Sequence, residues 1–184
     1  MKKAQVIKGF KFVHKFDRLR LCEWLDDDKM GTARRKALIL CGPMASGKST
    51  LLRRISEYKG EAPVLLNQYH GRIVEQGSLT WNHTVARELS SRRVVLLDDA
   101  IFSVVLFCDI MDIVDGKTFK IRKLYRDDYE TYSPTASVAV AVRAFNTDKA
   151  EEYVGAVARD CYESHKSRDG WEPFCLVRLE NREV

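Results

Sequence analysis

The chain lacks an apolar run long enough to cross a membrane, because the best candidate, residues 101–114, is short and carries Asp109 and Asp112. No long apolar segment follows the first residues, so we expect no signal peptide. The five cysteines include no Cys-x-x-Cys pair, and the four histidines show no ligand spacing. Because the cysteines mostly lie among apolar neighbours, we expect buried free thiols in a reducing compartment rather than a zinc site. We therefore expect an intracellular protein that has no membrane partner.

A large excess of charge of one sign is also missing. Lys and Arg number 31 against 26 Asp and Glu, which gives a net charge of +5. Such a small excess permits contact with a polyanion but does not require it. The 184 residues are enough for one buried α/β core with a short additional element. We expect an N-terminal helical segment over residues 1–35, used for packing or oligomerisation, and a main domain over residues 36–184.

The most specific motif fits the pattern G-x-x-x-x-G-K-[ST] and directly follows the apolar run at residues 37–41. It consists of Gly42, Pro43, Met44, Ala45, Ser46, Gly47, Lys48, Ser49 and Thr50. A strand, a glycine turn and a helix start direct backbone N–H groups and the positive end of a helix dipole at one point, where a triphosphate can bind. Lys48 would reach the β- and γ-phosphates, and the Ser49 hydroxyl would bind Mg²⁺. The motif predicts nucleotide binding, with ATP and Mg²⁺ as the cofactors.

Unbroken apolar runs predict strands that are buried on both faces. They lie at residues 64–66, 94–97, 137–142 and 174–177. Helices are predicted over residues 15–27 and 47–57, and in the stretch that ends at Val114. This alternation predicts an α/β fold with a mostly parallel central sheet, helices on both faces and a small N-terminal helical element.

Two adjacent carboxylates end the apolar run at residues 94–97. Neighbouring residues at a strand end point in different directions, so Asp98 can face the Mg²⁺ shell while Asp99 faces the attacking water. The alternative is that one of them caps the following helix. Paired acids behind a phosphate loop favour ATP hydrolysis.

A basic segment follows the turn-forming pair Asp115 and Gly116. Its candidate nucleic-acid-binding residues are Lys117, Phe119, Lys120, Arg122 and Lys123. Cations bind phosphates of any sequence, and an aromatic ring can stack on an unpaired base, so the segment predicts contact with single-stranded DNA. The alternative is a solvated surface hairpin with structural aromatic residues.

In their order and spacing, these motifs resemble those of the superfamily-3 replicative helicases of small DNA viruses, particularly the papillomavirus type. The resemblance covers residues 37–179. It rests on the phosphate loop, on residues 96–100, on the basic segment at 115–123, on Asn146 after a buried strand, and on the pair Ser167 and Arg168. It implies an AAA+-like P-loop ATPase that assembles as a ring, often a hexamer, around single-stranded or forked DNA. A viral protein of this type would act in the nucleus of an infected cell, and any other would be cytoplasmic.

The resemblance also implies roles for two polar residues. Asn146 would be the sensor that orients water near the γ-phosphate, and Arg168 would reach the nucleotide of the neighbouring subunit. Asn146 could instead cap a helix. Arg159 and Arg178 compete with Arg168 as the arginine finger.

The sequence therefore predicts an ATP-dependent DNA helicase or translocase of a viral-type replication initiator. Two alternatives stay open. A small-molecule P-loop kinase would have a similar length, and an inactive binding or oligomerisation module would keep nucleotide only for its structure.

Overall fold

The computed structural model describes residues 1–26, 36–60, 86–87, 90–91, 94–100, 104–122, 127–133, 136–142, 152, 156–157 and 174–181. The helices of these residues are α1 (Lys3–Ile7), α2 (Lys15–Asp26), α3 (Lys48–Lys59) and α5 (Val104–Asp115). The strands are β1 (Ala37–Cys41), β2 (Val94–Ala100), β3 (Phe119–Arg122), β4 (Tyr129–Tyr132), β5 (Ser137–Val142) and β6 (Phe174–Arg178). The strand predicted at residues 64–66 lies outside the described residues.

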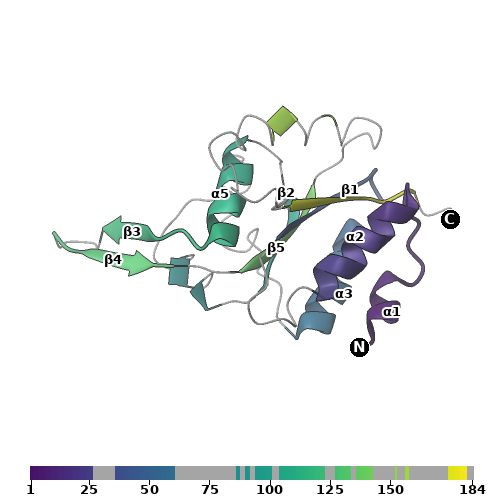
Figure 1. The fold of residues 1–184 in the computed structure, drawn as a ribbon, viewed down its shortest axis with the longest axis horizontal. Helices are drawn as coiled ribbons and strands as arrows, with labels where there is room; N and C mark the ends of the chain where they lie inside the picture. Colours follow the sequence, from purple (N-terminus) through teal and green to yellow (C-terminus); the bar gives the residue numbers. More distant parts are fainter. Residues whose placement is uncertain are drawn as a thin grey trace.

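A parallel sheet with the strand order β2-β5-β1-β6 forms the centre of the molecule (Figure 1). Leu38 of β1 pairs with Ala139 of β5 on one side and with Cys175 of β6 on the other. Every residue of β1 and β5 is buried, as their unbroken apolar sequences predict. The strand β5 thus separates β1 from β2, although it follows both of them in the chain.

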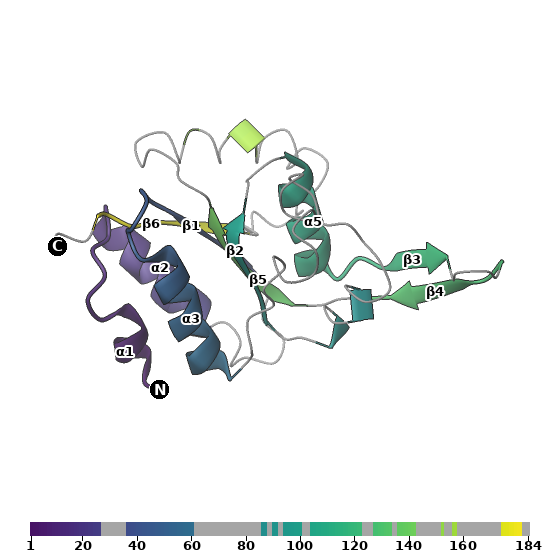
Figure 2. The same cartoon turned by 180° about the vertical axis from the view of Figure 1, so that it is seen from behind.

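Alternate residues of the strands face two separate hydrophobic clusters. In β1, Ile39 packs in the cluster that contains α5, whereas Leu38 and Leu40 pack in the cluster that contains α1, α2 and α3. Figure 2 shows the same two layers from behind, with α5 on one face of the sheet and α2 and α3 on the other. Successive side chains of a strand point to opposite faces, so one short apolar strand supplies both cores. The predicted α/β fold with helices on both faces is confirmed.

The N-terminal segment packs on this core. Leu21, Trp24 and Leu25 of α2 are buried in the cluster on the α3 side of the sheet, and Trp24 Nε1 donates to the Lys36 carbonyl oxygen at 2.9 Å. Ahead of α2, Phe12 forms an antiparallel bridge with Leu179, just beyond the end of β6. Helix α2 of the N-terminal segment therefore packs on the core.

No helix of the described residues is both long and apolar enough to span a bilayer. Cys22, Cys41 and Cys175 form no disulfide; Cys41 is buried, as predicted, whereas Cys22 and Cys175 are only partly buried. Cys108, however, is in a disulfide, so the prediction of free thiols is wrong for this residue.

Candidate functional site

The phosphate loop connects the end of β1 to the start of α3. Gly47 precedes the helix with φ +90°, and its carbonyl oxygen accepts from the Leu51 N–H at 2.8 Å. Gly42 has φ +154°, and a Cβ there would lie 2.6 Å from the carbonyl oxygen of Leu179. Glycine is therefore required at position 42 both for its backbone angle and for the close approach of the chain beyond β6.

Lys48, the first residue of α3, folds back across the loop. Its Nζ donates to the carbonyl oxygens of Gly42 at 2.7 Å and Pro43 at 2.8 Å. Partial burial lowers the pKa of Lys48, and the nearby carboxylates of Asp98 and Asp99 oppose that shift. The ammonium thus occupies the mouth of the loop, where it is available to an anionic ligand that competes with two carbonyl oxygens.

The loop and the carboxylate pair are in direct contact. Ser49 Oγ donates to Asp98 Oδ1 at 2.9 Å, which joins the start of α3 to the end of β2. Mg²⁺ is usually held by one or two carboxylates together with substrate phosphates, so a hydroxyl and a carboxylate side by side fit this ion. Among the described residues, no cluster of three or more His, Cys, Asp or Glu forms a metal site built from protein ligands alone.

Asp98 and Asp99 lie in an irregular part of β2. The sequence predicts a strand that ends in these two residues, and β2 continues one residue further, to Ala100, through a register shift between Leu97 and Ala100. Asp99 has φ +54°, and its N–H donates to Asp98 Oδ1 at 2.9 Å. A bulge of this kind turns consecutive side chains in new directions and is common beside active sites. Asp98 therefore faces Ser49, while the Asp99 side chain is exposed.

Other predicted site residues lie outside the described residues: Asn146, Arg159, Arg168 and Lys123. The described end of β5, Val142, pairs with Ala100 beside the carboxylates. Because β5 lies between β1 and β2, its carboxyl end lies between the phosphate loop and the acid pair.

Arg178 was an alternative arginine finger, and the structure gives it a different environment. Its Nε donates to Asp17 Oδ2 at 3.2 Å, and only 12% of its side chain is exposed. An arginine held this way by its own subunit is poorly placed to reach a neighbour. In the sheet, Arg178 is the register partner of Cys41, directly before the loop.

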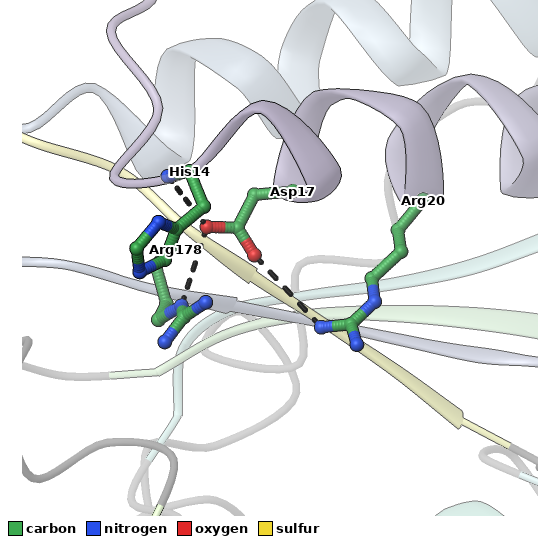
Figure 3. Close-up of polar contacts among 4 residues, drawn as sticks. All are labelled: His14, Asp17, Arg20 and Arg178. Atoms are coloured by element: carbon green, nitrogen blue, oxygen red, sulfur yellow. Dashed lines mark hydrogen bonds and ion pairs between the residues drawn. The ribbon is translucent and has the colours of Figure 1, made fainter.

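Asp17 is a fully buried carboxylate that the sequence analysis did not single out (Figure 3). Its Oδ2 accepts from the backbone N–H of His14 at 3.1 Å and from Arg178. Its Oδ1 has no hydrogen-bond donor among the described residues, and Arg20 Nη1 lies 4.0 Å away. Asp17 follows a helix start by two residues, so in the sequence it looks like an ordinary capping acid. The ion pair between Asp17 and Arg178 fixes α2 to β6, the strand that pairs with β1 just before the phosphate loop.

Cys41 occupies the same region. Burial raises the pKa of its thiol to about 12, although the positive charges of Lys48 and Arg178 oppose this shift. The thiol therefore stays neutral at physiological pH and is not a nucleophile.

The basic segment forms the predicted antiparallel hairpin, β3 and β4, which extends away from the sheet (Figure 1). Lys120 and Arg122 are exposed, whereas Phe119 is partly buried and alternates with them. Lys117 lies before the hairpin, where its Nζ forms an ion pair with Asp112 of α5 at 3.0 Å. The structure thus brings Lys120 and Arg122 onto one face and leaves Phe119 and Lys117 apart from them.

No family model matches the chain, and no curated protein matches it. One similar solved structure is a protein described as a candidate primosome component, from Streptococcus pyogenes serotype M3. It is 14% identical, with full coverage of both chains and a TM-score of 0.48. Another is NtrX from Brucella abortus in complex with ATP, which is 11% identical with a TM-score of 0.43. That match covers 97% of this chain and 41% of NtrX. These values are too low to transfer a function, so the fold assignment rests on the sheet topology and the loop after β1.

Proposed function

We propose that this chain is an ATP-dependent DNA helicase or translocase of the viral replication-initiator type. The observation that supports the proposal best is the hydrogen bond between Ser49 and Asp98. It brings the two groups expected to bind a metal ion into contact, although β5 lies between β2, which carries Asp98, and β1, which leads into the phosphate loop. A phosphate loop that served only as a turn would not need a carboxylate at this point.

In this mechanism the loop N–H groups and Lys48 hold the phosphates of ATP. Ser49 and Asp98 would hold Mg²⁺, which when bound neutralises charge on the phosphate oxygens. Asp99, on the bulge beside Asp98, accepts a proton from the attacking water, and Asn146 orients that water. Lys48 exchanges its bonds to Gly42 and Pro43 for bonds to the phosphates.

The resemblance supports a homo-oligomeric ring, often a hexamer, around single-stranded or forked DNA. In such a ring Arg168 would complete the site of the neighbouring subunit. The hairpin would contact the strand and move with each round of hydrolysis. If the protein is viral, we expect it in the nucleus of an infected cell. If it comes from any other source, we expect it in the cytoplasm.

The decisive experiment measures ATP turnover by the purified chain with and without single-stranded DNA, together with its mass with and without an ATP analogue. A DNA-driven ATPase should turn over faster with DNA and assemble with nucleotide. A small-molecule kinase should ignore DNA and stay the same size, so that pair of results would favour the kinase.

Asparagine substitutions separate the two acids. Asp99→Asn should bind Mg·ATP with nearly normal affinity but hydrolyse it about 10²- to 10⁴-fold more slowly, because an amide cannot accept the proton of water. Asp98→Asn should instead raise the Mg²⁺ concentration needed for turnover. Titrations of Mg²⁺ and ATP in steady-state assays measure both effects. If the two variants exchange phenotypes, the assigned roles are wrong.

A further inference from the structure

The hairpin exposes an aromatic residue that the sequence analysis did not select. Tyr129, the first residue of β4, is 60% exposed. In the antiparallel register it lies directly opposite Arg122, and Thr131 lies opposite Lys120. Residues directly opposite each other share one face of a pair of strands. Lys120, Arg122 and Tyr129 therefore lie together on what we call the exposed hairpin face.

The other face of the hairpin provides its packing. Phe119 lies opposite Tyr132, which is 6% exposed, and Ile121 next to them is partly buried. The hairpin thus has its aromatic packing pair without Tyr129. The Tyr129 ring is therefore accessible to a ligand.

The charges on the exposed hairpin face are not equivalent. Arg122 Nη2 forms an ion pair with Asp127 Oδ1 at 2.5 Å, so a phosphate must displace that carboxylate to reach the guanidinium. Lys120 has no ion pair among the described residues, and its side chain is exposed. Lys120 is therefore the cation most readily available to a polyanion.

A cation beside an exposed ring suits a single strand of nucleic acid. The cation binds the backbone irrespective of sequence, and the ring stacks on a base. In a duplex the base faces are covered by their neighbours, so a ring gains little there. We propose that Tyr129 stacks on an unpaired base of the single strand that the hairpin contacts, while Lys120 binds a phosphate of the same strand. This inference rests on the proposed function and adds the stacking residue.

The test compares the affinities of four variants for three fluorescent probes. The probes are a 20-nucleotide oligothymidylate, the same backbone with abasic sites throughout, and a duplex of equal length. The variants are Tyr129→Ala, Tyr129→Phe, Lys120→Ala and Lys8→Ala, of which the last removes an exposed lysine far from the hairpin. Each titration is repeated from 50 to 200 mM salt, and thermal unfolding shows whether every variant keeps the fold.

Tyr129→Ala should bind the oligothymidylate about 5- to 100-fold more weakly with an unchanged salt slope, whereas Tyr129→Phe should stay within about threefold of the wild type. On the abasic probe, Tyr129→Ala and the wild type should bind equally. Lys120→Ala should lower the log–log salt slope by ~0.7, and Lys8→Ala should leave it unchanged.

Two results would overturn the stacking role. In one, Tyr129→Ala binds the oligothymidylate as tightly as the wild type does. The exposed ring would then be assigned to contact with a protein partner instead of a base. In the other, Tyr129→Ala loses equal affinity for the abasic or duplex probe. If Lys120→Ala still lowers the salt slope in those cases, the proposed DNA-binding function survives without the stacking residue. If the wild type binds none of the probes, the function and the inference both fail.

Discussion

Replacing Lys48 with alanine should reduce ATP turnover by about 10²- to 10³-fold or more and weaken nucleotide binding. The substitution deletes the cation at the mouth of the phosphate loop, where charge develops during phosphoryl transfer. In the wild type this ammonium donates to the Gly42 carbonyl oxygen at 2.7 Å, within the loop itself. Steady-state turnover and equilibrium titration with an ATP analogue measure the two effects.

The matched control for this prediction is Arg53→Ala, which removes an exposed cation from the same helix. It should turn over ATP at the wild-type rate. The fold of Lys48→Ala should also survive, since water can replace the lysine at the two carbonyl oxygens. Turnover within a few-fold of the wild type in Lys48→Ala would remove the phosphate loop from the mechanism.

Replacing Asp17 with alanine should cost about 3–5 kcal/mol of unfolding free energy, because it leaves the largely buried Arg178 guanidinium without its counter-charge. Asp17→Asn should cost less, since an amide oxygen can still accept from His14 and Arg178. A double variant, Asp17→Leu with Arg178→Met, should recover much of the loss because no charge is left buried. Denaturant unfolding at equilibrium measures all three variants.

Asp26→Ala provides the comparison on the same helix. Asp26 forms its ion pair with Lys3 at the surface, where 48% of its side chain is exposed. Its loss should cost at most about 1 kcal/mol. Equal losses in Asp17→Ala and Asp26→Ala would show that the buried pair contributes nothing special to stability.

The sequence predicted the central sheet well because its strands are short apolar runs with clear ends. Residues 137–142 form β5 as predicted, and the helix after the phosphate loop begins at Lys48 and ends at Lys59, before the αL residue Gly60. These features are local: a run of buried residues and a glycine define them without knowledge of their neighbours.

The residues that the sequence did not reveal depend on contacts between distant segments. The pair of Asp17 and Arg178 joins the first helices to the last strand, and neither residue has an unusual local pattern. The position of β5 between β1 and β2 is likewise a property of the assembled sheet. The alternation along β3 could have divided the basic segment into two faces, since Phe119 and Lys120 are adjacent in a strand.

Helix α5 connects the carboxylate pair of β2 to the hairpin that is proposed to contact DNA. It begins at Val104, shortly after β2 ends beside the carboxylates, and it ends at Asp115, shortly before β3. At its far end, the Lys117 N–H donates to the Asp112 carbonyl oxygen at 2.8 Å, and the two side chains form an ion pair. A helix of 12 residues is about 18 Å long. A tilt of this helix by about 10° at the carboxylate end would therefore displace its hairpin end by about 3 Å.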